Sequence, residues 1–201
     1  ILIIFLLYYL LANDIDCAGV NYPAQTRILG VGVGSVNTNC GFVGTFEGQG
    51  HTISNFKAPK GGLFLVVGNN AIIRNVGFKN AILDTQTDND KFILATYIFG
   101  ASIENVYIES NSFINTVNNA LVCGHASTST YFSNCVFVFS GDVVERVSLA
   151  HSYGVISHFA ESSSVLHTTN FDNTYVLSAI PLAVCKDKYF VGAGFTSVPT
   201  F

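Results

Sequence analysis

A short unit of the form apolar-x-Asn-apolar recurs along this chain and constrains its fold more than any other feature. Repetition at intervals of roughly 20 to 50 residues is typical of solenoids and other repeat architectures. The repeat predicts an architecture and says less about activity, because one scaffold can carry many functions. The copies are Ile53-Ser54-Asn55-Phe56, Ile73-Arg74-Asn75-Val76, Ile103-Glu104-Asn105-Val106 and Phe132-Ser133-Asn134-Cys135, with an echo without the Asn in Leu166-His167-Thr168-Thr169.

A second apolar unit alternates with the first, starting at residues 62, 92, 121 and 154. Alternation of side-chain character, as in Val106-Tyr107-Ile108-Glu109 and Cys135-Val136-Phe137-Val138-Phe139, indicates short strands. No stretch shows helical periodicity. Each period therefore holds two or three strands with their turns, which predicts one rung of a β-solenoid rather than a hairpin.

The Asn units predict two columns of stacked side chains, because rungs of a parallel solenoid lie about 4.8 Å apart. Ile53, Ile73, Ile103 and Phe132, followed by Leu166, are predicted to stack as one inward column. Asn55, Asn75, Asn105 and Asn134 are predicted to form a corner ladder of hydrogen-bonded amides. Asn also tolerates the left-handed backbone of a tight corner, so we interpret these residues as structural rather than ligand-binding.

The segment Gly44-Thr45-Phe46-Glu47-Gly48-Gln49-Gly50-His51-Thr52-Ile53-Ser54-Asn55 resembles the opening of GLUG-type and related right-handed β-helix repeats. The later parts of that repeat are matched by Gly62-Leu63-Phe64 and Ile73-Arg74-Asn75-Val76, and Leu11-Ala12-Asn13-Asp14-Ile15-Asp16-Cys17 resembles its upstream strand. The chain departs from the pattern at Glu47, where Asp is usual, and at Leu65, where Gly is usual. The resemblance covers residues 8 to 140.

This resemblance implies an all-β fold, a right-handed parallel β-helix of about five to six rungs. Such helices are typical of secreted bacterial surface proteins and adhesins, and similar ones occur in phage tail spikes and fibres. No catalytic residues belong to the repeat, so the resemblance assigns none here.

Residues 1–201 are predicted to form a single domain and, because Met is absent, a processed part or fragment of a longer chain. Residues 1–16 are predicted to be an N-terminal strand or cap, and residues 186–201 an irregular tail. The apolar run Ile1–Leu11 is shorter than the about 20 residues that a membrane-spanning helix needs. It is interpreted as a cap of the solenoid end or as the remnant of a signal peptide.

Five cysteines leave two readings open. Cys17 with Cys40, and Cys123 with Cys135, are candidate disulfides in an oxidising compartment. Alternatively, all four are small apolar residues of the interior. Their spacing does not match a structural zinc site.

Residues that carry chemistry are sparse. Asp84, Asp88 and Asp90 form a candidate calcium site, with a solvated loop as the alternative. No nucleophile motif or phosphate-binding loop is present, so we expect no catalytic residues and no cofactor. A net charge of −4 with only nine Lys and Arg argues against a nucleic-acid partner.

The sequence therefore favours a non-enzymatic structural or adhesive module of an extracellular surface protein, fibre or virion appendage. Its expected partners are identical or related chains, because an open solenoid end must be capped or continued. Surface glycans are a further candidate partner. The alternatives are a passive spacer and a polysaccharide lyase or glycoside hydrolase, since parallel β-helices also carry that chemistry.

Overall fold

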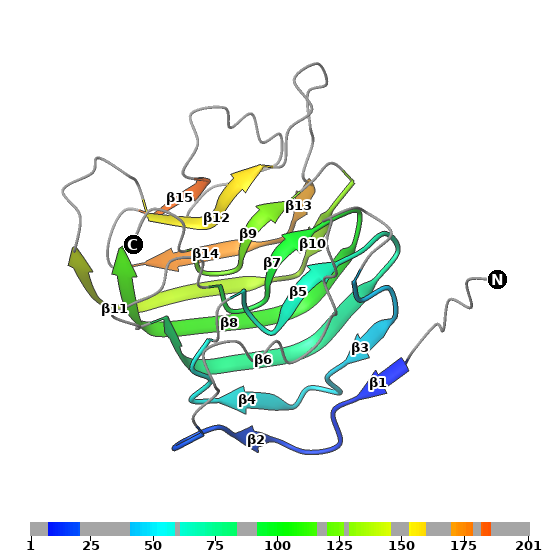
Figure 1. The fold of residues 1–201 in the computed structure, drawn as a ribbon, viewed down its shortest axis with the longest axis horizontal. Coiled ribbons are helices and arrows are strands. Elements are labelled where there is room, and N and C mark those ends of the chain that lie inside the picture. The colour runs from blue at the N-terminus through cyan, green and yellow to red at the C-terminus, as the bar shows by residue number, and fades with distance from the viewer. Residues whose placement is uncertain are drawn as a thin grey trace.

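The computed structural model shows an all-β protein with long parallel sheets (Figure 1), which confirms the all-β prediction. The structure describes residues 8–20, 41–58, 61–83, 92–115, 120–126, 129–145, 153–159, 170–178 and 182–185. No helix occurs in these ranges. Within them, accordingly, no helix has the length and apolar character needed to cross a membrane.

The larger sheet has ten strands, and every pair in it is parallel. Its longest strands are the central ones, and short strands lie at both ends. They are β1 (Tyr8–Leu10), β2 (Ile15–Asp16), β3 (Thr45–Glu47), β4 (Thr52–Ser54), β6 (Ile72–Leu83), β8 (Ser102–Asn115), β10 (Tyr131–Ser133), β11 (Val136–Glu145), β13 (Asn170–Asp172) and β14 (Tyr175–Ser178).

The smaller sheet is also parallel and has five strands in sequence order. It is built from the second apolar unit of the sequence, so Phe64, Ala95, Cys123 and Ile156 lie in register. Its strands are β5 (Phe64–Val67), β7 (Ala95–Ile98), β9 (Cys123–Ala126), β12 (Tyr153–Phe159) and β15 (Leu182–Cys185).

From β4 onwards the chain alternates between the two sheets: β5 separates β4 from β6, β7 separates β6 from β8, and β9 separates β8 from β10. In Figure 1 the colour of the larger sheet runs from blue at β1 and β2 to orange at β13 and β14, so its strands lie in chain order. Parallel neighbours require such long connections, because a short turn joins only antiparallel strands.

The hydrophobic core is built from columns of side chains that occupy the same register position on successive strands. Phe46, Ile73, Ile103, Phe132 and Phe171 form one such column, and the exposed fraction is 0% for Ile73, Ile103 and Phe132. The rings of Phe132 and Phe171 stack at 4.9 Å. Burial of such apolar columns is the main force that holds the two sheets together.

The predicted register was wrong for Ile53 and Asn55. Ile53 pairs with Phe78 rather than with Ile73, and Asn55 donates its backbone N–H to the carbonyl of Lys79, next to Asn80. The reason is that β6 holds the repeat unit twice, as Ile73-Arg74-Asn75-Val76 and as Phe78-Lys79-Asn80-Ala81. The copy that comes first in the sequence, Ile53-Ser54-Asn55-Phe56, therefore lies beside Phe78-Lys79-Asn80-Ala81.

The echo of the unit was also placed wrongly. The position that follows Phe132 in the core column is taken by Phe171, and Asp172 lies in register with Ser133. Asn173 then follows with a φ of 44°, so the unit retains its Asn here as Phe171-Asp172-Asn173-Thr174. Leu166 lies outside the described residues.

The candidate disulfide between Cys123 and Cys135 is wrong, and the alternative of a small residue in the interior holds for Cys135. Cys123 is on β9 of the smaller sheet, whereas Cys135 is a buried thiol that contacts the carbonyl oxygens of Ile103 and Ser133 in the larger sheet. Burial raises the pKa of the Cys135 thiol to about 11. Cys17 is likewise buried, and its candidate partner Cys40 lies outside the described residues.

The remaining boundary predictions meet the structure only in part. Residues 8–16 contribute β1 and β2, which form the N-terminal edge of the larger sheet. Residues 1–7 and 186–201 lie outside the described residues, so the cap and the irregular tail stay predictions.

Candidate functional site

A ladder of side-chain amides runs along one corner of the larger sheet. Asn75 and Asn105 have φ values of 55° and 52°, in the left-handed region where Asn is favoured over most residues. The Nδ2 of Asn105 donates to the Oδ1 of Asn75 at 2.8 Å. The Nδ2 of Asn75 in turn donates to the Oε1 of Glu47 at 2.9 Å. Every bond of this ladder therefore points its donor toward the N-terminal strands.

Glu47 ends this ladder as an acceptor, which suits a group that has no donor when ionised. Its side chain is buried, and it also accepts from the backbone N–H of Gln49 and from the Nε of Arg74, at 2.9 and 2.6 Å. Burial raises the pKa of Glu47, but the bonds from Asn75, Gln49 and Arg74 together outweigh burial and hold that pKa below its usual value. The carboxylate thus ties β3 and the corner that follows it to β6.

A second pair of amides continues the same corner toward the C-terminal strands. Asn134 and Asn173 have φ values of 53° and 44°. The Nδ2 of Asn173 donates to the Oδ1 of Asn134 at 2.7 Å, and the hydroxyl of Tyr175 donates to the Oδ1 of Asn173 at 2.9 Å. These amides bond to one another and to neighbouring side chains, which is the arrangement of a structural ladder.

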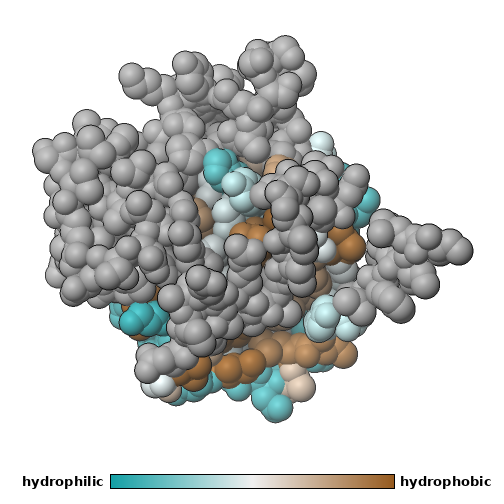
Figure 2. Space-filling view, in the orientation of Figure 1, coloured by the Kyte–Doolittle hydropathy of each residue, from teal (hydrophilic) through white to brown (hydrophobic). Residues whose placement is uncertain are grey.

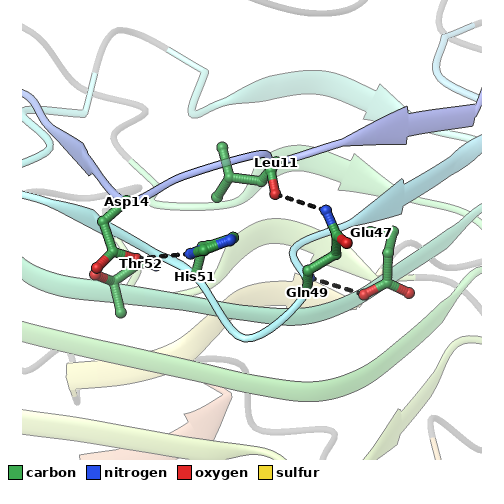
Figure 3. A network of polar contacts seen from close by, with 6 residues as sticks. All are labelled: Leu11, Asp14, Glu47, Gln49, His51 and Thr52. Carbon is green, nitrogen blue, oxygen red and sulfur yellow. Dashed lines mark hydrogen bonds and ion pairs between the residues drawn. The ribbon is translucent and has the colours of Figure 1, made fainter.

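The corner between β3 and β4 is wider than the corner at the matching position of β6, the strand that pairs with both. Four residues, 48–51, separate Glu47 from Thr52, whereas two residues, Asn75 and Val76, separate their partners Arg74 and Gly77. A Cβ at Gly48 would lie 2.3 Å from the carbonyl oxygen of Asn75, so only glycine fits there. The wide corner projects Gln49 and His51 toward the β1–β2 segment (Figure 3).

These projecting groups tie the N-terminal segment to the next strands. Gln49 donates its Nε2 to the carbonyl of Leu11 at 3.0 Å, and the Oδ1 of Asp14 accepts from the backbone of Thr52 at 2.8 Å and contacts the Nδ1 of His51 at 3.2 Å (Figure 3). Asp16 accepts from the Nδ2 of Asn55 at 2.7 Å. Both aspartates flank Ile15.

The pKa values of Asp14 and Asp16 lie below the usual range. For Asp14 the main cause is the backbone N–H of Thr52, and for Asp16 it is the side-chain amide of Asn55. Both carboxylates are therefore charged at neutral pH. With 71% of its side chain exposed, Asp14 presents that charge to the solvent.

The N-terminal edge beside these aspartates is apolar. Tyr8 and Leu10 are 57% and 56% exposed. Tyr9 and Ile15 stand in register with the buried Phe46 and Ile53, yet they are 37% and 44% exposed. Figure 2 shows hydrophobic residues gathered along this lower edge of the molecule. The columns of core side chains therefore end in solvent-exposed residues at this edge.

The backbone of β1 also faces outward at this edge. Among the described residues β1 pairs only with β3, and the N–H of Leu11 bonds to the carbonyl of Glu47 at 2.9 Å. Successive N–H groups of a strand point to opposite sides, so the N–H of Leu10 points away from β3. Such an edge can accept a further strand.

The predicted metal site lies outside the described residues, because Asp84, Asp88 and Asp90 all fall in 84–90. Within the described part of the chain, no group of three or more His, Cys, Asp or Glu side chains is placed to hold a metal ion. Calcium binding therefore stays a prediction.

Sequence reasoning missed the N-terminal edge as a candidate site. The i, i+2 spacing of Asp14 and Asp16 places both on one face of a strand, but it gives no partner for either. Thr52 and Asn55 lie 38 and 39 residues further along the chain. The apolar run that ends at Leu11, followed by two aspartates, was the signal that could have indicated a charged edge.

No protein-family model matches the chain, and no curated protein sequence matches it. One solved structure is similar: the crystal structure of a protein from Bacteroides ovatus described as a putative immunoglobulin A1 protease. The similarity covers 96% of this chain and 74% of that chain, at 17% identity and a TM-score of 0.41. Values this low support no inference about function, and the GLUG-type resemblance stays a prediction.

Proposed function

We propose that this chain is a non-enzymatic structural module of an extracellular surface protein, fibre or virion appendage, and that its N-terminal edge joins it to another polypeptide chain. We further propose that it is a right-handed β-solenoid. The alternation of the chain between two parallel sheets supports a solenoid, and the strong preference of parallel crossovers for a right-handed path supports its hand.

The exposed N-terminal edge carries this proposal. Tyr9 and Ile15 occupy core positions and remain accessible, and the N–H of Leu10 points outward. Addition of a strand would bury these side chains and satisfy that backbone group, as in β-strand augmentation. An apolar, open edge is otherwise a liability that soluble proteins cover or blunt.

The alternative of a polysaccharide lyase or hydrolase has less support. A hydrolase needs a carboxyl group with a raised pKa as its general acid. Among the described carboxyl groups, those of Asp14, Asp16 and Glu47 have lowered pKa values and are bound by donors. Release of reducing or unsaturated sugars from a broad glycan panel by the purified protein would favour the enzyme instead.

Glycan contact is a second candidate for the same module. Tyr131 and Tyr175 are 49% and 41% exposed on the larger sheet, and aromatic faces stack on sugar rings. A glycan array probed with the protein and with a Tyr131→Ala, Tyr175→Ala variant tests this candidate. Binding that the variant retains in full would contradict it.

The edge itself is tested with a neutral strand probe. A fluorescent peptide that copies residues 8–16, with Asn at both aspartate positions, should bind the protein, as measured by anisotropy. Leu10→Pro removes the outward N–H and should abolish binding, since Pro cannot donate to a partner strand. Leu10→Ala keeps the N–H and is the matched control. Absence of binding to the unmodified protein would overturn the proposal.

A further inference from the structure

We propose that the N-terminal edge selects a strand with basic residues opposite Asp14 and Asp16, and that this strand belongs to a different polypeptide chain rather than to a second copy of this one. The inference rests on the proposed function, which makes the edge the joining surface. It adds the chemistry of the partner.

The two aspartates are fixed at positions where a docked strand must meet them. Asp16 pairs in register with Ser54, and Asp14 accepts from the backbone of Thr52. Ile15 between them points toward the core column of Ile53, so both carboxylates lie on the outward face. Their bonds to Thr52, His51 and Asn55 hold them on that face.

One column of this sheet shows that opposite charges pair in register across neighbouring strands. Glu47, Arg74 and Glu104 occupy one register position on β3, β6 and β8, and the Nε of Arg74 lies 2.6 Å from the Oε2 of Glu47. Adjacent strands are about 4.8 Å apart, so opposite charges in register attract, and like charges there are destabilising.

Asp14 and Asp16 stand at the open end of two other columns, in which their neighbours Thr52 and Ser54 are uncharged. A strand added in parallel register would place one residue opposite each of them. Because opposite charges in register attract, as between Glu47 and Arg74, those residues are Lys or Arg in the best partner. Residues opposite Tyr9 and Ile15 are apolar, because they would extend the core columns. The partner strand is therefore apolar on its inner face and basic on its outer face.

The far end of this same sheet does not offer that pattern. Following the register from strand to strand, Tyr175 and Leu177 of β14 occupy the columns of Asp14 and Asp16. Head-to-tail stacking of two copies would set Asp16 against Leu177, with no cation to compensate its lost hydration. A second copy is therefore a poor occupant, and a chain with basic residues at these positions fits.

The test compares three peptides that copy residues 8–16 with Asn, Lys or Asp at the two aspartate positions. At low salt the Lys peptide should bind about tenfold more tightly than the Asn peptide, and the Asp peptide most weakly. The differences in affinity among the three peptides should disappear as the salt concentration rises, because exposed charges are screened.

The protein variant Asp14→Asn, Asp16→Asn keeps an oxygen acceptor at each position and removes both charges. It should bind all three peptides equally, whereas Asp172→Asn, which removes one exposed charge at the other end of the sheet, should leave the ranking intact. Equal affinities on the unmodified protein would overturn charge selection while leaving the edge proposal standing.

Two further outcomes separate the parts of the inference. Binding of the Lys peptide that survives Leu10→Pro would show attraction to negative charge without strand docking, and would overturn the inference. Sedimentation of the unmodified protein as oligomers that Leu10→Pro disperses would show that a second copy is the occupant, and would overturn the choice of a different chain. A monomer in that experiment supports it.

Discussion

At the scale of single residues, this protein uses polar side chains to lock corners that its backbone could not hold alone. Asn75 and Asn105 adopt left-handed φ values and at the same time bond to the side chain before them in the ladder. Glu47 closes that ladder as a buried acceptor. The corner therefore needs a particular residue type for conformation and for hydrogen bonding together.

Glu47→Gln should make the protein less sensitive to acid. The pKa of Glu47 is lower in the folded chain than its usual value of 4.5, so its contribution to stability is present above pH 4.5 and is lost as pH falls through the folded pKa. The variant should be less stable at pH 7, with a shallower loss below pH 4.5. Urea unfolding at several pH values measures both, and parallel curves for the two proteins would contradict the assignment.

Asn105→Ala and Asn105→Gly separate the two roles of the ladder residues. Both remove the bond to Asn75, which is worth about 1 kcal/mol. Ala also bears the cost of the left-handed backbone, about 1–2 kcal/mol, which Gly avoids. We expect Ala to lower the free energy of unfolding more than Gly. Asn111→Ala, at an exposed position on the same strand without a positive φ, is the control and should change it by about 0.5 kcal/mol or less.

At the scale of elements, stacking in register determines what each strand contributes. Phe132 of β10 is fully buried between Ile103 of β8 and Phe171 of β13, its two neighbours in the core column. Tyr131, one residue earlier, faces outward and is 49% exposed. Adjacent residues of one strand therefore have opposite energetic roles, as the period of two requires.

Phe132→Ala should lower the free energy of unfolding by about 3–5 kcal/mol, because it leaves a cavity against Phe171 and Phe137. Tyr131→Ala, on the opposite face of the same strand, should cost about 1 kcal/mol or less. Chemical denaturation of both variants measures the difference. Similar losses at the two positions would contradict the register of β10.

The sequence was sufficient to predict an all-β chain and the positions of many strands, because its repeat units correspond to parallel strands of two sheets. It could not decide the register of Ile53, since Ile73-Arg74-Asn75 and Phe78-Lys79-Asn80 match the unit equally well. The register is decided by the four-residue corner after Glu47, which places Ile53 beside Phe78 instead of Ile73. The bonds of Asp14 and Asp16 were equally hidden, because their partners come from a strand far along the chain.

At the scale of the whole molecule, the two ends of the larger sheet differ. The β1–β2 end presents apolar core positions beside Asp14 and Asp16, and the β13–β14 end has Tyr175 and Leu177 in the same columns. The two ends of the larger sheet therefore offer different surfaces to a partner. A module of this kind would be joined at one end by a partner of defined chemistry rather than by indiscriminate pairing of edges.

The most direct measurement is residue-resolved hydrogen exchange by NMR, with and without a saturating amount of the neutral peptide. The N–H of Leu11 bonds to Glu47 and should be protected in both states. The N–H of Leu10 should exchange rapidly in the free protein and become protected when the peptide is bound. An unchanged rate at Leu10, or new protection confined to the strands of Tyr131 and Tyr175, would contradict the account.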